Sequence, residues 1–115
     1  RSYKAGEEVV ITINGEGLRN VNAFSLALPY DPADYEFVRI EALNTGNMAN
    51  YSKNRLHGDG NTVIYPTFIN EGNQDTISGD EALVKVVLKA KRRVRFEIEA
   101  VDGFIVDKHL NTIKF

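Results

Sequence analysis

The stretch that decides the fold is Val21-Asn22-Ala23-Phe24-Ser25-Leu26-Ala27-Leu28-Pro29-Tyr30, followed at once by Asp31-Pro32. Large apolar side chains at every second position alternate with small ones; the large set is Phe24, Leu26 and Leu28, and the small set is Ala23, Ser25 and Ala27. This two-residue period predicts a β-strand with a bulky inner face and a small outer face. Proline cannot donate a hydrogen bond to a sheet, so Pro29 indicates the strand's end and Asp31-Pro32 predicts a turn.

The same alternation recurs along most of the chain. It predicts strands over residues 8–14, 35–43, 51–56, 62–69, 81–90 and 94–100, with one or two short strands in residues 103–115. Turn-forming residues separate these segments, notably at residues 14–17, 44–47, 57–61 and 70–80. No segment keeps the period of a helix over three turns. The pattern therefore predicts an all-β protein, an antiparallel sandwich or barrel, with one domain over residues 1–115.

Two strands carry more specific expectations. In residues 35–43 the alternation places Val38, Ile40 and Ala42 on one face, opposite Phe37, Arg39 and Glu41. In residues 62–69, Pro66 predicts that part of the strand is an edge or a bulge.

Composition excludes several classes of function. The 115 residues contain no cysteine, which removes thiol nucleophiles, iron–sulfur clusters and cysteine zinc sites. Fourteen Lys and Arg against 16 Asp and Glu give a net charge of −2, which argues against binding to nucleic acid. No apolar run is long enough to cross a bilayer. Because the chain begins at Arg1 without a methionine or an apolar leader, we expect a module excised from a longer protein.

Side chains that could carry catalysis are scattered. The two histidines, His57 and His109, fall in separate turn-rich segments, where exposed turn residues are expected. No serine lies in a Gly-x-Ser-x-Gly context. A pair of carboxylates for glycoside hydrolysis could be drawn only from acidic residues in or beside one polar loop, where solvated side chains are the usual outcome: Glu71, Asp75, Asp80 and Glu81. The sequence therefore predicts that the chain is not an enzyme.

Two segments rich in polar or charged side chains are candidate ligand sites. Residues 70–80 hold five oxygen-bearing side chains suited to calcium, although their spacing does not match a helix-flanked calcium loop: Asn70, Glu71, Asn73, Asp75 and Asp80. We interpret the segment as a polar loop and keep calcium as the alternative. The basic run from Lys89 to Arg95 is interpreted as a solvated hairpin tip.

The aromatic residues leave a limited sugar-binding option. The chain has no tryptophan, and Phe24, Phe96 and Phe104 are predicted to face the core. The aromatics that could face outward are Tyr3, Tyr35, Tyr51 and Tyr65, and we expect most of them to be half-buried sheet residues. Tyr51 and Tyr65 are the two that could line a groove for a sugar.

Several motifs together resemble a cohesin module. They are Ala5-Gly6-Glu7-Glu8-Val9, the strand from Asn20 that leads into Tyr30-Asp31-Pro32, Tyr35-Glu36-Phe37-Val38, and Ile77-Ser78-Gly79-Asp80-Glu81-Ala82-Leu83-Val84-Lys85-Val86 followed by Leu88-Lys89-Ala90-Lys91. They occur in the family's order and span nearly the whole chain. The resemblance implies a nine-stranded jelly-roll β-sandwich from a secreted, multimodular bacterial protein that degrades polysaccharides.

The resemblance also implies a protein partner. Cohesins bind dockerin modules through one flat sheet face, and in cellulosomal members an Asn and an Asp, seven and five residues before the Tyr of Tyr-Asp-Pro, bond to the dockerin. Here these positions hold Ala23 and Ser25. Ala23 offers no polar partner and Ser25 only a short one. Together with Ala27 they nevertheless form a small-residue face that suits close approach by another protein.

The functional expectation is thus a non-catalytic module, secreted or at the cell surface, without a required cofactor. It would associate with a dockerin-type or neighbouring module, or space its neighbours, through a face that includes Ala23, Ser25, Ala27, Asn70 and Glu71. The alternative is a carbohydrate-binding module that targets an attached glycoside hydrolase to its polysaccharide through Tyr51 and Tyr65.

Overall fold

The computed structural model describes residues 1–56, 62–72 and 75–114. These residues form eleven strands and no helix: β1 (Ser2–Tyr3), β2 (Glu8–Tyr30), β3 (Tyr35–Ala42), β4 (Ala49–Asn50), β5 (Lys53–Leu56), β6 (Thr62–Tyr65), β7 (Thr67–Ile69), β8 (Ile77–Ala90), β9 (Val94–Arg95), β10 (Asp102–Asp107) and β11 (Thr112–Lys114). Every pairing among them is antiparallel. The predicted all-β sandwich is confirmed.

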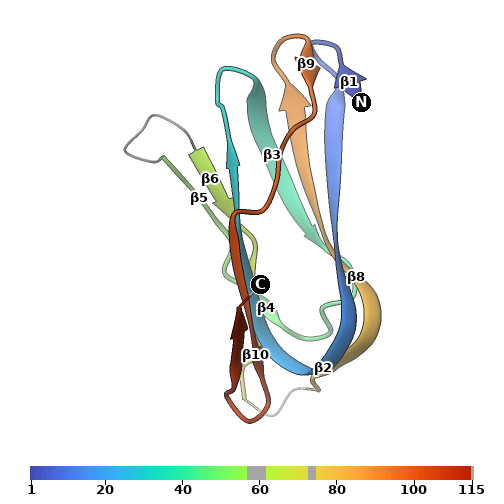
Figure 1. Ribbon diagram of the computed structural model, residues 1–115, viewed down its shortest axis with the longest axis vertical. Helices are drawn as coiled ribbons and strands as arrows, with labels where there is room; N and C mark the ends of the chain where they lie inside the picture. Colours follow the sequence, from blue (N-terminus) through green and yellow to red (C-terminus); the bar gives the residue numbers. More distant parts are fainter. Residues whose placement is uncertain (57–61, 73–74, 115) are drawn as a thin grey trace.

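The long strand β2 belongs to both layers of the sandwich, as its curved path in Figure 1 shows. Its first part, residues 8–15, pairs with β8, which also pairs with β3. We call this layer the β8 sheet. Its second part, residues 21–30, pairs with β10 on one side and with β7 and β6 on the other. This layer, completed by β11, β4 and β5, is called the β10 sheet.

The predicted strand break at residues 14–17 is wrong. The chain bends there without leaving the ladder, because Gly17 and Asn20 take positive φ angles of 60° and 48° and the register with β8 shifts. The bend is held from β8, where Asp80 Oδ1 accepts from Gly17 N at 2.7 Å and Ser78 Oγ accepts from Asn20 N at 2.9 Å. Strand β8 therefore begins at Ile77, earlier than the predicted residue 81.

The core lies between the two sheets. Phe24 and Phe68 stack with ring centroids 5.3 Å apart, and both are almost fully buried. The predicted inward set of Phe24, Leu26 and Leu28 is confirmed, as is the contact of Phe96 with the core. From the other sheet the core receives the buried side chains of Val9, Val84, Val86 and Leu88.

In β3 the predicted faces are wrong. A bulge interrupts the pairing with β8 between Phe37 and Arg39, so the alternation shifts by one residue at Val38. Phe37 and Ile40 both pack against the core, whereas Val38 is 40% exposed. The alternating sequence of residues 35–43 does not indicate the position of this bulge.

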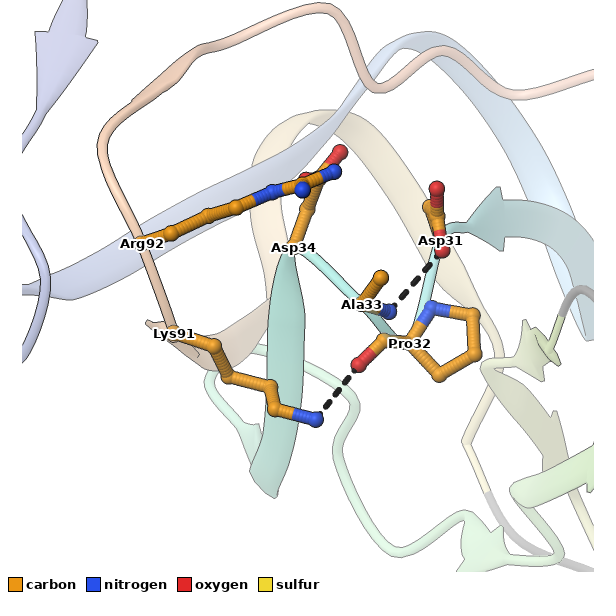
Figure 2. A network of polar contacts seen from close by, with 6 residues as sticks. All are labelled: Asp31, Pro32, Ala33, Asp34, Lys91 and Arg92. Carbon is orange, nitrogen blue, oxygen red and sulfur yellow. Dashed lines mark hydrogen bonds and ion pairs between the residues drawn. The ribbon is translucent and has the colours of Figure 1, made fainter.

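The predicted turn after β2 is confirmed, and Figure 2 shows how it is fixed. Asp31 Oδ1 accepts from Ala33 N at 2.9 Å, and the amide of Asp34 donates to the carbonyl of Asp31. The basic run reaches this turn. Lys91 Nζ donates to the carbonyl of Pro32 at 2.7 Å, and Arg92 Nε lies 2.5 Å from Asp34 Oδ1. The tip of the basic run is exposed as predicted, but Lys91 and Arg92 also bind the turn of residues 31–34.

The hairpin predicted in residues 51–69 is present as β5 and β6, and its turn, with His57, lies outside the described residues. Pro66 separates β6 from β7, as expected for a bulge, and its carbonyl accepts from Leu26 N at 3.1 Å. Tyr35, one of the four tyrosines that could have faced outward, is buried in the core cluster, and this burial raises the pKa of its phenol.

Candidate functional site

The outer face of the β10 sheet is flat and carries mostly small and apolar side chains. The register aligns two rows across it, Val106–Ala23–Ile69–Ala49 and Phe104–Ser25–Thr67. Ala23 and Ser25 are partly exposed at the centre. The Ser25 and Thr67 hydroxyls share a hydrogen bond at 2.7 Å, so neither stands out as an unsatisfied polar group. Ala23 and Ser25 thus lie where the sequence predicted, at the middle of an open face.

Two residues expected on this face contribute little to it. Ala27 is only 8% exposed, in the row next to Asp102. Asn70 is buried, with Nδ2 donating to the carbonyl of Asp75 at 3.3 Å and its backbone amide donating to Asn22. Glu71 is exposed as expected.

Phe104 is the largest departure from the sequence prediction. It was expected in the core, but it is 39% exposed on this face, opposite Ser25. The neighbouring Ile105 takes the inward position and pairs with Phe24. With Ile69 and Tyr51, which are 38% and 47% exposed, Phe104 gives the face an apolar rim around its small centre.

A groove of about 390 Å³ opens at one side of this face, lined by Ser25, Tyr51, Lys53, Arg55, Tyr65, Thr67 and Ile69. It brings Tyr51 and Tyr65 together, as the sugar-binding alternative required. The Tyr51 hydroxyl donates to Glu71 Oε1, and this hydrogen bond, followed by the charge of Glu71, raises the pKa of Tyr51. Lys53 and Arg55 were not predicted as site residues, although their i, i+2 spacing on a strand could have indicated a shared face.

A turn between β10 and β11 adds an exposed leucine. Leu110 is 75% exposed and has a φ of 66°, which is unusual for a residue other than glycine. Asp107 fixes the turn by accepting from the backbone amides of His109 and Asn111, both at 2.9 Å. The hydrogen bonds from Asn111 lower the pKa of Asp107. His109 is exposed, as predicted, and sequence reasoning did not single out Leu110.

A further cleft lies between the two sheets rather than on a face. Its volume is about 510 Å³, and apart from Asn14, Gly15 and Glu16 its lining is apolar, including Ile11, Phe24, Ile98 and Ile113. Titratable groups do not converge in it, so its chemistry is that of an apolar core.

The acidic residues considered for catalysis and calcium are held in different ways. Asp80 accepts from Gly17, and Glu71 accepts from Tyr51. Asn73 lies outside the described residues. Within the part of the chain that the structure describes, no three His, Cys, Asp or Glu side chains form a group that could hold a metal ion. Calcium binding stays a prediction.

The family model described as "Cohesin domain" matches residues 1–112. The chain belongs to the cohesin family. The resemblance inferred from the sequence motifs is therefore confirmed, and the flat outer face belongs to a cohesin β-sandwich. Comparison with curated protein sequences finds no match.

Solved cohesin structures share this fold. A type I cohesin from Clostridium thermocellum, solved in complex with a dockerin, has a TM-score of 0.70 at 20% identity over 96% of this chain and 79% of its own. The sixth cohesin of scaffoldin B from Acetivibrio cellulolyticus, also solved with a dockerin, has a TM-score of 0.71 at 16% identity over 96% and 83%. A cohesin module of a family 33 glycoside hydrolase from Clostridium perfringens has a TM-score of 0.60 at 19% identity over 96% and 89%.

Cohesin domains are interaction modules without catalytic activity. Within the residues that the structure describes, no helix is long and apolar enough to cross a membrane.

Proposed function

We propose that this cohesin joins a secreted or cell-surface bacterial glycan-degrading protein to a dockerin-type module. The observation that carries the proposal is the outer face of the β10 sheet. It has small side chains at Ala23 and Ser25 and an exposed apolar rim that includes Phe104. A protein partner gains most where aromatic and apolar groups become buried around a flat centre.

The dockerin would meet this face without the polar anchors of cellulosomal cohesins. Ala23 has no polar atom in its side chain, and the Ser25 hydroxyl already shares a hydrogen bond with Thr67. Binding would therefore depend on shape and apolar burial, supplied by Phe104 and Ile69.

The parent protein is inferred from relatives. One structural neighbour is the cohesin module of a glycoside hydrolase, and two others were solved with dockerins. These neighbours support an extracellular or cell-surface setting and a glycan-degrading parent. An association with a neighbouring module of the same protein would use the same face. A spacing role would use no binding face.

Isothermal titration calorimetry of the folded module with a panel of dockerins tests the proposal. The panel includes the dockerins seen with the Clostridium thermocellum and Acetivibrio cellulolyticus cohesins, together with modules that neighbour this chain in its own protein. We expect saturable one-to-one binding by at least one of them. If the folded module binds none of these proteins, the protein-association role is excluded.

The groove at the side of the face favours a second candidate, which is carbohydrate binding. Tyr51 and Tyr65 line it together with polar side chains, as sugar sites require. A glycan array tests this candidate, and the expected positive result is binding that a Tyr51→Ala variant loses. Silence on the array would exclude it.

A further inference from the structure

Two cations lie side by side in the groove of the β10 sheet. Lys53 and Arg55 occupy alternate positions of β5, and both line the groove. Asn54, between them, points to the other side of the strand, where it donates to the Tyr30 hydroxyl at 3.1 Å. The strand thus directs both positive charges into one groove. Strand β5 lies at the end of the sheet order, so nothing in the sheet covers its far side.

These two charges have no counterion in the described part of the chain. Neither Lys53 nor Arg55 has a side-chain hydrogen bond or ion pair with another described residue. This contrasts with Arg39, which pairs with Glu8 and Glu41, and with Arg92, which pairs with Asp34. The carboxylate beside the groove, Glu71, accepts a hydrogen bond from Tyr51. Among the described residues, these two cations of the groove are therefore unpaired, in a chain whose net charge is −2.

The surroundings of the two cations strengthen their attraction for an anion. On the neighbouring strand β6, Tyr65 lies opposite Lys53, and Val63, which is almost fully buried, lies opposite Arg55. Ile69 and Thr67 form the side toward the centre of the face. A charge beside low-dielectric side chains interacts more strongly with a counter-charge than one surrounded by water. An anion that displaced water from this groove would therefore gain from both cations.

We propose that the groove binds an acidic segment of the protein partner that carries two carboxylates about 6–7 Å apart, the spacing of alternate positions on a strand. Two Asp or Glu side chains three or four positions apart on a helix meet this spacing within about 1 Å. The inference rests on the proposed function, since the segment belongs to the module that covers the adjoining apolar face. The apolar face supplies contact area, and the groove selects partners by charge.

A peptide experiment tests the groove without a known partner. The probe is a synthetic helical peptide with a glutamate at every fourth position, and its control replaces each glutamate by glutamine. Binding to the isotope-labelled module is followed by NMR. We expect the glutamate peptide to shift the amides of Lys53, Arg55 and Thr67, and to do so less as salt screens the charges. Equal shifts with both peptides, or shifts elsewhere on the module, would overturn the inference.

A matched pair of variants separates the groove from net charge. Lys53→Glu with Arg55→Glu should abolish binding of the glutamate peptide. Lys4→Glu with Arg93→Glu changes the net charge equally at exposed positions that do not line the groove and should leave binding within about twofold. Loss of binding in both double variants would overturn the proposal. Charged residues also protect edge strands from pairing with other chains. If Lys53 and Arg55 served only to protect the edge strand β5, peptide binding would be unchanged in both double variants, and the proposal would be overturned.

Two further arms identify the source of the carboxylates. Oligogalacturonate binding that depends on Lys53 and Arg55, with no binding of the peptide, would assign the groove to an acidic polysaccharide and overturn the protein partner. For a dockerin that binds the module, the groove variant should weaken binding about tenfold or more. Unchanged dockerin binding would overturn this inference while the proposed function stands. A module that binds no dockerin would overturn the proposed function, and the peptide result would still decide the groove.

Discussion

The two sheets of this sandwich present opposite kinds of outer face. On the β8 sheet, charged side chains satisfy one another, as Arg39 does with Glu41 at 2.6 Å and with Glu8 at 3.7 Å. On the β10 sheet, the centre is small and apolar around Ala23, and the cations at its side have no partner among the described residues. Both faces belong to the same fold and share strand β2.

This difference separates what the fold needs from what an interaction needs. A solvated sheet face needs no large apolar side chains to be stable, so exposed Phe104 and Ile69 on the β10 sheet are not required for folding. Groups that gain nothing within the module are those that a partner could use. The contrast between the two faces therefore suggests two kinds of variant. One kind should change the stability of the module and leave its affinity for the partner unchanged, and the other kind should do the reverse.

The largest effect is expected in the hydrophobic core between the two sheets. Replacing Phe68 by alanine removes a fully buried ring and its stacking on Phe24. The cavity should lower the free energy of unfolding by about 3–5 kcal/mol. Chemical denaturation measures this loss. A loss below about 1 kcal/mol would mean that the sheets can collapse onto the space, and that the core positions the outer faces less rigidly than argued.

Much of that core could be predicted from the sequence. The alternation around Phe24 fixes its inward face because large and small side chains differ so clearly there. Tyr30-Asp31-Pro32 indicated the turn through proline geometry and the Asx hydrogen bond to Ala33. The continuity of β2 through Gly17 could not be predicted, since it depends on Asp80 and Ser78 from a distant strand.

The next largest effect concerns the centre of the partner-binding face. Ala23→Arg places a long charged side chain between Val106 and Ile69. We expect dockerin binding to weaken at least a hundredfold, about 2.7 kcal/mol, because a flat contact cannot accommodate the added volume. Calorimetry measures binding and thermal unfolding measures stability, which should change little since Ala23 is partly exposed.

Val10→Arg is the matched control on the β8 sheet. Val10 is also exposed on β2, but on the other layer, so binding should be unchanged. Equal losses of binding in both variants would contradict the assignment of the partner to the β10 sheet.

A smaller effect is expected at the apolar rim. Phe104→Ala should weaken dockerin binding about tenfold, because aromatic side chains that a partner covers carry much of the energy of an interface. Its effect on the free energy of unfolding should stay near 1 kcal/mol, since the ring is already 39% exposed. Calorimetry and denaturation on the same variant compare the two losses. A stability loss comparable with that of Phe68→Ala would show that the ring belongs to the core.

Phe104 shows where sequence reasoning failed at the site. Aromatic residues are usually assigned inward, yet the run from Gly103 to Val106 has apolar residues on both faces, so the pattern alone cannot choose between Phe104 and Ile105. The pairing with β2 settles it by aligning Ile105 with Phe24. Similarly, of the adjacent polar residues Asn70 and Glu71, only Asn70 is buried, and its hydrogen bonds to the backbone of Asn22 and Asp75 depend on segments that the local pattern does not specify.

The smallest effect is expected on the β8 face, where Arg39→Ala removes the ion pairs with Glu41 and Glu8. The hydrogen bond from Arg39 lowers the pKa of Glu41, so the pair stabilises the folded module above the unfolded-state pKa of about 4.3. That contribution is lost as the pH falls through the lowered folded-state pKa. Because these side chains are exposed, thermal unfolding should show a small loss at neutral pH that disappears in high salt.

Arg55→Ala is the corresponding change on the other sheet, and the two variants together give the sharpest form of the comparison. Arg55 has no ion pair with a described residue, so its removal should leave the melting temperature unchanged and weaken dockerin binding, while Arg39→Ala should leave binding unchanged. If Arg39→Ala weakened binding instead, the partner would cover the charged face. The self-satisfied charges of the β8 sheet would then be part of the interface, and unpaired charge would no longer identify the face that a partner uses.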